Sequence, residues 1–310
     1  MGNVLVLLST YNGERYLREQ LDSLYAQEGV GIHILVRDDG SSDRTLDILN
    51  EYSIKYGNLE IIKGYNVGAT RSFYQLVYYA IDNLACFDYY AFCDQDDFCK
   101  SQKIITAVRR LDKLKGENRL YFCNSTYVDE NLNIIKESDF YYDGCFKHCI
   151  VRNIALGCTM VLNNNLFHLA GKASKCFFVE DREEYIPLHD VWFYAFAHCI
   201  GASVLYDRDS HIMYRQHGNN VTQAYKGFWR RYLLGIKNTF KTPDSHWALA
   251  HCLYLSNSFF DDDVTNYLNK IVCYKKSYIK TISLALMIDL RGESFLDKQL
   301  WRVMILFRTF

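Results

Sequence analysis

Short apolar runs alternate with segments of helical periodicity through the first 125 residues of the chain. In the helical segments, apolar side chains recur every three or four positions, as on the buried face of an amphipathic helix. This alternation is typical of β-α-β units, so we expect an α/β fold with a mixed, mostly parallel sheet flanked by helices. The expected strands are 4–8, 32–36, 59–62 and 89–93, and the expected helices carry Leu17, Leu21, Leu24 and Tyr25, then Leu46, Ile48 and Leu49, then 71–80.

Polar residues suited to helix N-caps precede the first two of these helices. Asn12 stands before the first helix, and Ser42 or Asp43 stands before the second. We therefore expect these side chains to accept hydrogen bonds from the first backbone N–H groups of each helix.

From about residue 120 the alternation weakens, and strands at 120–123, 159–162 and 203–206 with a helix at 191–198 are expected to extend the same sheet. After residue 225 the pattern is helical and aromatic, with no strand signal. The sequence therefore predicts an α/β domain over 1–224 and a helical, basic, aromatic-rich extension over 225–310. The extension begins with Phe228, Trp229, Tyr232 and Leu233, continues through 247–260, and ends in two basic amphipathic stretches.

The composition indicates an ordered globular protein, because 49% of the 310 residues are hydrophobic and a chain of this length can bury a full core. The formal net charge is −1, but residues 225–310 hold 13 Lys+Arg against 7 Asp+Glu. A basic end favours contact with an anionic surface. The basic residues form no dense patch, so we expect no nucleic-acid partner.

The eleven cysteines contain no CxxC pair and lie mostly in apolar segments, as expected for reduced core residues of a cytosolic protein. Cys145 and Cys149, with His148 between them, lack the second ligand pair of a zinc knuckle. The chain enters an apolar strand at Val4 without the basic region of a signal peptide, and no apolar run reaches the roughly 18 residues of a membrane span. We therefore expect a cytoplasmic protein, free or peripheral on the inner face of the cell membrane.

An acidic cluster, Asp94-Gln95-Asp96-Asp97, follows the apolar run 89–93. Crowded carboxylates at the end of a buried strand repel each other unless a cation or a donor-rich ligand compensates them. The cluster therefore predicts a site for a metal and a phosphate; the alternative is a solvated acidic turn in which Asp97 caps a helix beginning near Ser101.

Thr10 and Asp39 also follow strand ends, and in open α/β sheets ligands bind beyond the carboxyl ends of the strands. The chain contains neither GxGxxG nor GxxxxGK[ST], which disfavours a dinucleotide dehydrogenase or a P-loop enzyme. Thr10, Tyr11 and Asn12 offer a hydroxyl and a flat ring, and Asp39 can accept a hydrogen bond from the imide N–H of uracil or thymine. These groups suit a pyrimidine base, although Thr10 and Asp39 taken singly also fit helix caps.

Three motifs, LSTYNG at 8–13, DDGSSD at 38–43 and FCDQDD at 92–97, together resemble the successive signatures of glycosyltransferase family 2, which has the GT-A fold. The resemblance covers about residues 3–220. It implies transfer of a sugar from a nucleotide diphosphate donor with inversion at the anomeric carbon, assisted by Mg²⁺ or Mn²⁺.

By this resemblance, 94–97 corresponds to the family's DXD-type motif. Asp96 would be the most direct ligand of the metal that bridges the two phosphates, with Asp94 and Asp97 beside it. Gln95 would belong to the donor nucleotide site. Carboxylate oxygens are the ligand type that these hard cations prefer. Arg71 stands where family members place a basic residue near the donor; the alternative is a solvated arginine at a helix start.

An inverting transfer needs a base that takes the proton of the attacking hydroxyl. Asp190, in the segment PLHDVW at 187–192, resembles the residue that fills this role in the family, and the alternative is an N-cap for the following helix. His189 stands where the family usually has Glu. A His-Asp pair of this kind occurs in the family's rhamnosyltransferase-like branch. We expect His189 and Trp192 on the diphosphate or acceptor side of the site.

Two further segments resemble the same branch, GCTM at 157–160 and YRQHGNNV at 214–221. Gly157 and Cys158 are expected to form a wall against which donor sugar and acceptor pack. His217 would complete the metal shell or contact the diphosphate, and Arg215 would pair with phosphate.

The resulting hypothesis is an inverting, metal-dependent glycosyltransferase that moves a sugar, by resemblance rhamnose, from a dTDP- or UDP-sugar to a glycan or undecaprenyl-type lipid-linked acceptor in bacterial surface polysaccharide synthesis. The alternatives are another hexosyl donor, an inert nucleotide-sugar-binding or scaffold protein, and a nucleotidyltransferase, which would need a glycine-rich, lysine-bearing loop. For the extension we keep three alternatives: an anionic membrane surface, a subdomain packed on the α/β domain, and a homodimer interface. Its aromatic residues include Trp229, Trp247, Trp301 and Phe310.

Overall fold

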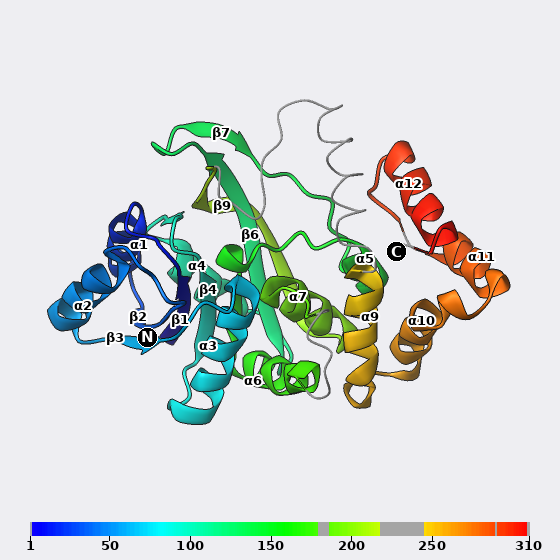
Figure 1. The fold of residues 1–310 in the computed structure, drawn as a ribbon, viewed down its shortest axis with the longest axis horizontal. Coiled ribbons are helices and arrows are strands. Elements are labelled where there is room, and N and C mark those ends of the chain that lie inside the picture. Colours follow the sequence, from blue (N-terminus) through cyan, green and yellow to red (C-terminus); the bar gives the residue numbers. More distant parts are fainter. Residues whose placement is uncertain (1, 179–185, 218–244, 289, 309–310) are drawn as a thin grey trace.

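The computed structural model describes residues 2–178, 186–217, 245–288 and 290–308. Its first half is a parallel sheet in the order β3-β2-β1-β4 (Figure 1). The strands are nearly continuous apolar runs because both faces of the sheet are covered: Leu5 and Leu7 pack into one core cluster and Val4, Val6 and Leu8 into the other. The strands are β1 (Asn3–Thr10), β2 (Gly31–Asp38), β3 (Leu59–Lys63) and β4 (Tyr89–Cys93).

The helices that cross between these strands are α1 (Leu17–Tyr25), α2 (Thr45–Tyr56) and α3 (Ala69–Asn83). The predicted cap of α1 is wrong, because Tyr16 is its N-cap residue and Asn12 has a positive φ of 47° in the preceding loop. The N-cap residue of α2 is Arg44, but the carboxylate of Asp43 accepts from the N–H of Thr45 at 3.0 Å.

The second half of the sheet is mixed. Strand β8 (Val161–Asn163) pairs antiparallel to β4 and to β6 (Arg119–Val128), and β9 (Ser203–Arg215) runs parallel to β6. The predicted α/β class and mixed sheet are confirmed, and nine strands form one sheet within the described residues. The other elements here are β5 (Phe98–Cys99), β7 (Ile134–Glu137), α4 (Lys103–Leu111), α5 (Phe146–Val151), α6 (Asn164–Ala173), η2 (Ser174–Phe178) and α7 (His189–Cys199).

Several strand boundaries differ from the prediction, including that of β6, which runs to Val128, and two of the differences bear on the site. The segment expected as a strand at 159–162 begins as a 3-10 turn, η1 (Gly157–Thr159), and only then enters β8. Strand β9 continues far beyond residue 206, because it pairs with β6 as far as Arg215 and also with β5 at Ile212 and Met213. This extension carries Arg215 to the edge of the sheet where the acidic cluster lies.

The C-terminal part is helical, as predicted, and its first helices pack on the α/β part. Leu249 and Leu268 belong to the same core cluster as Phe196 of α7. Residues 228–233 and Phe310, and the expected boundary at 224, lie outside the described residues, so the two-domain division stays a prediction. No helix that the structure describes is both long and apolar enough to cross a membrane. The elements are α9 (Ser245–Leu255), η4 (Asn257–Phe259), α10 (Asp262–Val272), η5 (Tyr274–Lys276), α11 (Tyr278–Met287) and α12 (Phe295–Leu306).

Candidate functional site

The loops that follow β1 and β2 are braced against each other by their own polar side chains. Asp38 accepts from the hydroxyl of Thr10 at 3.2 Å and from the N–H of Ser41 at 2.9 Å. The side-chain oxygen of Asn12 accepts from the N–H of Ser42 at 2.9 Å. Thr10 is buried, whereas Tyr11 is 46% exposed at the mouth of the site. Among the four residues predicted to receive a pyrimidine base, Thr10, Tyr11, Asn12 and Asp39, Tyr11 therefore contributes an exposed ring.

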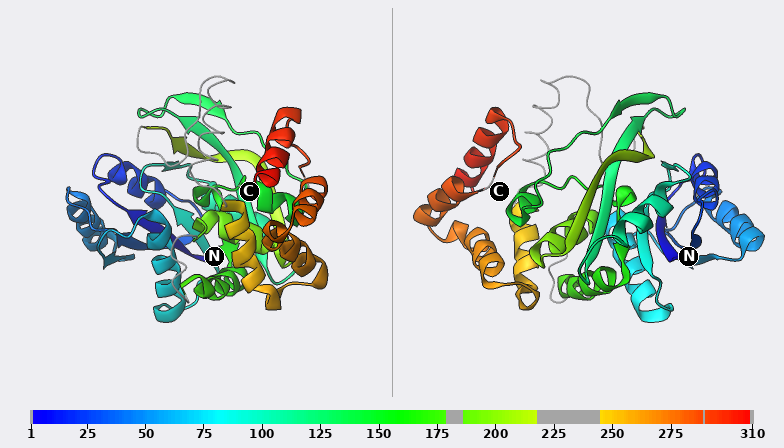
Figure 2. Two further views of the ribbon diagram at one scale, coloured as in Figure 1. Left: turned by 45° about the vertical axis from the view of Figure 1, so that its right-hand side comes forward. Right: turned by 180° about the vertical axis from the view of Figure 1, so that it is seen from behind.

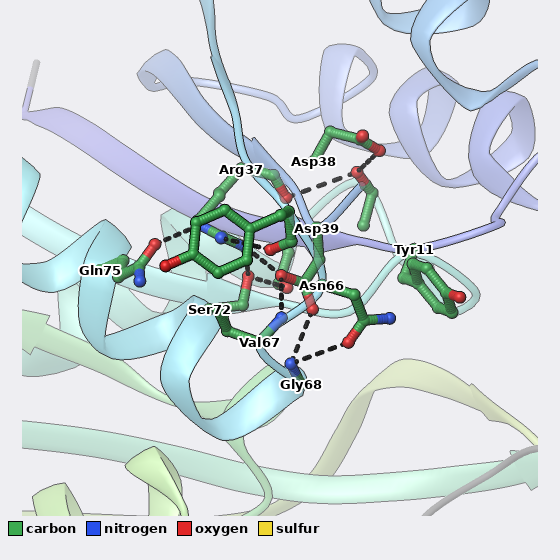
Figure 3. Close-up of polar contacts among 12 residues, drawn as sticks. Tyr11, Arg37, Asp38, Asp39, Asn66, Val67, Gly68, Ser72 and Gln75 are labelled. Carbon is green, nitrogen blue, oxygen red and sulfur yellow. Dashed lines mark hydrogen bonds and ion pairs between the residues drawn. The ribbon is translucent and has the colours of Figure 1, made fainter. Parts of the chain in front are cut away.

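Asp39 is held by an ion pair with Arg37 and by the backbone N–H groups of Val67 and Gly68, each at 2.9 Å (Figure 3). Arg37 is itself buried and also donates to Gln75 at 2.6 Å. The network shapes the loop between β3 and α3, so contact of Asp39 with a base stays a prediction. The sequence analysis does not single out Arg37. The feature that points to it is its position as the one charged residue between the apolar residues of β2 and the two aspartates that follow.

Gln95 joins the acidic turn to the loop after β1. Its side-chain oxygen accepts from the N–H of Tyr11 at 2.8 Å, and its side-chain nitrogen donates to the carbonyl of Tyr11 at 3.1 Å. The amide lies directly over Gly13, where a Cβ would overlap the oxygen of Gln95. Gln95 therefore fixes the position of Tyr11 relative to the carboxylates.

Asp94 and Asp97 lie together with Cys158, and one ligand atom from each falls within 4.8 Å of the others. Burial, together with the charges of Asp96 and Asp190, raises the pKa of Asp94 to about 7. The Asp97 pKa is also raised by burial. One oxygen of Asp97 accepts from the N–H of Arg215 at 3.1 Å, and its buried second oxygen has no hydrogen-bond partner within the described residues. The electrostatic penalty expected from the sequence is thus present. Asp97 is not the cap of α4, whose N-cap residue is Gln102.

Arg215 clamps the acidic turn onto α1. Its guanidinium forms an ion pair with Glu19, donates to the carbonyl of Asp96 at 2.8 Å and also donates to the carbonyl of Glu130. It lies 4.5 Å from the ring centroid of Tyr16. The side chain is only 1% exposed, so its predicted pairing with phosphate stays a prediction. The sequence does not predict Glu19 or Tyr16 as site residues, because Glu19 occupies an ordinary polar position of an amphipathic helix and Tyr16 directly precedes that helix.

His217 stands beside Asp96, as the metal prediction requires. Its Nε2 lies 2.8 Å from Oδ2 of Asp96, and its ring stacks on Tyr16 at 5.4 Å. Two ligands at neighbouring corners of an octahedron around Mg²⁺ lie about 2.9 Å apart. A carboxylate oxygen and an imidazole nitrogen are both ordinary ligands of Mn²⁺, and carboxylates of Mg²⁺. The residues present therefore fit the expected divalent cation, with Asp94 next to this pair.

Asp190 lies in the first turn of α7 against the 3-10 turn η1. Its carboxylate accepts from the N–H of Val191 at 2.7 Å and also accepts from the N–H of Gly157. Burial raises the Asp190 pKa to about 6, close to the range in which a general base works. The alternative of a plain N-cap is wrong, because Leu188 is the N-cap residue of α7.

His189 is a neutral, buried imidazole. It stacks on Phe73 with 3.8 Å between ring centroids and meets the edge of Phe92 at 4.6 Å. Burial lowers the pKa of His189 to about 3. Its Nε2 points at Gly157, where a Cβ would overlap it. Gly157, predicted as part of a wall, thus packs against His189 at the start of α7, whereas Cys158 lies with Asp94 and Asp97.

One predicted site residue, Trp192, lies in the core instead. The Trp192 indole is fully buried and donates to the carbonyl of Ala170 at 3.0 Å. It therefore packs α7 against α6 in the core, and the expected place on the acceptor side is wrong. Arg71 lies, partly exposed, in the first turn of α3, which leaves its donor contact a prediction.

Comparison with known proteins adds three findings. The model of glycosyl transferase family 2 matches residues 5–174. The dTDP-rhamnosyl transferase RfbG of Shigella flexneri is 30% identical over 290 residues, covering 90% of this chain and 92% of that protein. An uncharacterized glycosyltransferase of Rickettsia typhi is 25% identical over 243 residues, covering 74% of this chain and 71% of that protein.

Among solved structures, residues 1–349 of S. aureus TarS in complex with UDP superpose with a TM-score of 0.54 at 16% identity, covering 96% of this chain and 78% of that one. The same fragment in complex with UDP-GlcNAc gives a TM-score of 0.55 at 17% identity, covering 93% and 76%. At this identity the likeness shows the fold alone.

Proposed function

The chain belongs to glycosyl transferase family 2 and is a glycosyltransferase of GT-A fold, and from this premise we propose that it is an inverting, metal-dependent enzyme that transfers rhamnose from a dTDP- or UDP-sugar. The observation that carries the proposal is the meeting of the acidic turn, His217 and Asp190 at one edge of the sheet. The Asp96 and His217 side chains are 2.8 Å apart, and the Asp190 charge contributes to the raised pKa of Asp94.

On the donor side, Tyr11 offers an exposed ring for a pyrimidine base, and Asp39 lies in the neighbouring loop. Asp94, Asp96 and His217 would hold Mn²⁺ or Mg²⁺ against the diphosphate. When bound, such a cation supplies positive charge that stabilises the leaving nucleotide diphosphate. The braced loops would hold these groups in place before the donor arrives, so little ordering free energy is needed at binding.

On the acceptor side, Asp190 acts as the general base. Its carboxylate takes the proton of the acceptor hydroxyl while the hydroxyl oxygen attacks the anomeric carbon, the bond to the diphosphate oxygen breaks, and the configuration inverts. Two backbone N–H groups, those of Gly157 and Val191, orient the carboxylate. An inert nucleotide-sugar-binding protein has no need of such an oriented, ionisable carboxylate beside the donor site.

The choice of rhamnose rests on the likeness to the dTDP-rhamnosyl transferase of Shigella flexneri, which extends over 90% of this chain. We propose as acceptor a glycan, free or on an undecaprenyl-type lipid, as the family resemblance of the sequence motifs implies. We place the reaction in bacterial surface polysaccharide synthesis. The UDP and UDP-GlcNAc complexes belong to a protein of only 16–17% identity, so they favour a nucleotide-sugar donor without choosing the sugar.

Thermal unfolding in the presence of nucleotide sugars tests the donor. A ligand that binds only the native state raises the unfolding temperature by mass action. We expect dTDP-rhamnose with Mn²⁺ to give the largest rise in a panel that includes UDP-glucose, UDP-galactose and UDP-GlcNAc. A larger rise with a UDP-hexose would replace rhamnose as the donor, and no rise with any nucleotide sugar would contradict the proposed site.

A further inference from the structure

Helices α11 and α12 carry a concentration of exposed apolar side chains. Eight of the nineteen exposed large hydrophobic residues in the described part of the chain fall within 278–307, and five of them are more than 70% exposed. We call these eight the α11–α12 surface. They are Tyr278, Ile279, Ile282, Leu286, Phe295, Val303, Leu306 and Phe307.

The exposed side chains of α11 form one stripe, because Ile279, Ile282 and Leu286 have the i, i+3, i+7 spacing of a helix face. The helix meets the rest of the protein on its other face, where Thr281 and Leu284 are each 1% exposed. A helix that has already buried one apolar face needs no second one for folding. Its exposed stripe is therefore available to something outside the fold.

The surroundings of this surface are basic. Residues 275–308 hold seven lysines and arginines against three aspartates and glutamates. Lys276 at the end of η5 and Lys280 in the first turn of α11 are exposed. The guanidinium of Arg308 lies 4.2 Å from the ring centroid of Tyr278. Apolar side chains with lysine and arginine around them are the composition of a helix that lies in the interface of an anionic membrane.

We propose that the α11–α12 surface docks on an anionic lipid bilayer. A second copy of the chain is a poorer fit, because a twofold interface would place the same excess of positive charge against itself. Of the aromatic residues that first suggested a membrane contact, Trp247 and Trp301 make contacts within the protein instead. Within the described part of the extension, Trp247 donates to the carbonyl of Val272 at 3.1 Å and Trp301 packs against His246.

The α11–α12 hairpin forms one end of the molecule, and α2 lies at the other (Figures 1 and 2). Docking through this end leaves the acidic turn uncovered. The inference does not depend on the donor, the metal or the reaction, so lipid binding can be measured with none of them present.

Co-sedimentation of the full chain with lipid vesicles tests the proposal. We expect binding to phosphatidylcholine vesicles with about one-third phosphatidylglycerol, and at least fivefold weaker binding to phosphatidylcholine alone. Raising the salt from about 0.1 M to 0.5 M should weaken the binding, because the electrostatic part is screened. Failure of the wild type to sediment with the anionic vesicles would overturn the proposal.

The double substitution Ile279→Ser and Leu286→Ser should reduce vesicle binding at least fivefold, and so should Lys276→Glu with Lys280→Glu. The matched controls are Ile54→Ser on α2, where the side chain is 88% exposed, and Lys113→Glu with Lys115→Glu after α4; both should bind like the wild type. Unchanged binding by both double variants would contradict the proposal. A second result would also contradict the proposal. Light scattering would show that the wild type is an oligomer and that Ile279→Ser with Leu286→Ser converts it to a monomer, while vesicle binding stays unchanged. A second copy of the chain, rather than a membrane, would then cover the surface.

Discussion

Nε2 of His217 lies 2.8 Å from Oδ2 of Asp96, although 121 positions separate the two residues. The sheet brings them together. Strand β5, directly after the acidic turn, pairs with β9 so that Phe98 stands opposite Met213. The register therefore carries the residues that follow Met213 to the acidic turn, and the N–H of Arg215 completes the connection by donating to Asp97 at 3.1 Å.

Replacing Arg215 should loosen this connection. Arg215→Met removes two hydrogen bonds to backbone carbonyls and an ion pair in which the arginine, though not Glu19, is buried. We therefore expect the free energy of unfolding to fall by about 2–4 kcal/mol. The matched control is Arg18→Met, also an arginine paired with a glutamate of a neighbouring segment, but with about half of each side chain exposed. That change should cost less than about 1 kcal/mol. Urea unfolding measures both; equal losses would show that Arg215 is no clamp.

Most of the fold could be predicted because strand and helix signals are local. The parallel half of the sheet, with β1 to β4, follows from apolar runs that are buried on both faces. The end of β9 could not be predicted, since its polar residues are ordered by pairing with β5 and β6 rather than by their own pattern. The mistaken cap at Asn12 has a similar origin: its side chain bonds Ser42 across the sheet edge instead of its own helix.

The candidate site divides in the same way. Asp94, Asp96, Asp190 and His217 could be chosen as candidates because they lie in short motifs, and their roles stay predictions. Glu19 and Arg37 could not, because each acts through a partner that is distant or buried in the fold. Trp192 was misplaced because its neighbour Asp190 belongs to the site, whereas the indole two positions later faces the core.

Gly157→Ala should disturb the base without touching the acidic turn. The new methyl group would overlap Nε2 of His189, which is pinned between Phe73 and Phe92. We expect turnover to fall about 10- to 100-fold, because small displacements of a catalytic group have effects of this size. Steady-state kinetics measure the change.

The control for this substitution is Gly31→Ala, at the exposed start of β2, which should leave turnover unchanged. His189→Ala in the Gly157→Ala background makes room for the methyl group and should recover part of the loss. Wild-type turnover of the Gly157→Ala enzyme would contradict the claim that η1 positions the Asp190 carboxylate.

The reaction should lose rate as the pH falls through about 6. Burial raises the Asp190 pKa to about 6, and only the ionised carboxylate can accept the proton of the acceptor. We therefore expect kcat/KM to rise about tenfold per unit below pH 6 and to level off above pH 7. A profile that is flat from pH 5 to 7.5 would contradict Asp190 as the base. Asp190→Asn should lower turnover about 10²- to 10⁴-fold, whereas the surface change Asp82→Asn should not.

The stability of the metal-free protein should fall as the pH rises toward 7. Asp94 has its pKa raised from 3.8 to about 7, so the folded state binds a proton that the unfolded state has already released in this range. Asp94→Asn should reduce the fall in melting temperature between pH 5 and 8. Mn²⁺ should stabilise the wild type more at pH 8 than at pH 5.5, because it competes with that proton. If the melting temperatures of the wild type and Asp94→Asn depended on pH in the same way, protonation of Asp94 would not be the cause of the fall in stability.

Calorimetric titration of dTDP-rhamnose, with and without Mn²⁺, tests the central claim most directly when the wild type is compared with Asp96→Ala and Asp190→Asn. If the acidic turn holds the metal and the diphosphate, the wild type and Asp190→Asn should bind the donor at least tenfold more tightly with Mn²⁺, and Asp96→Ala should lose that gain. An Asp96→Ala protein whose donor affinity still rises with Mn²⁺ as in the wild type would contradict the account.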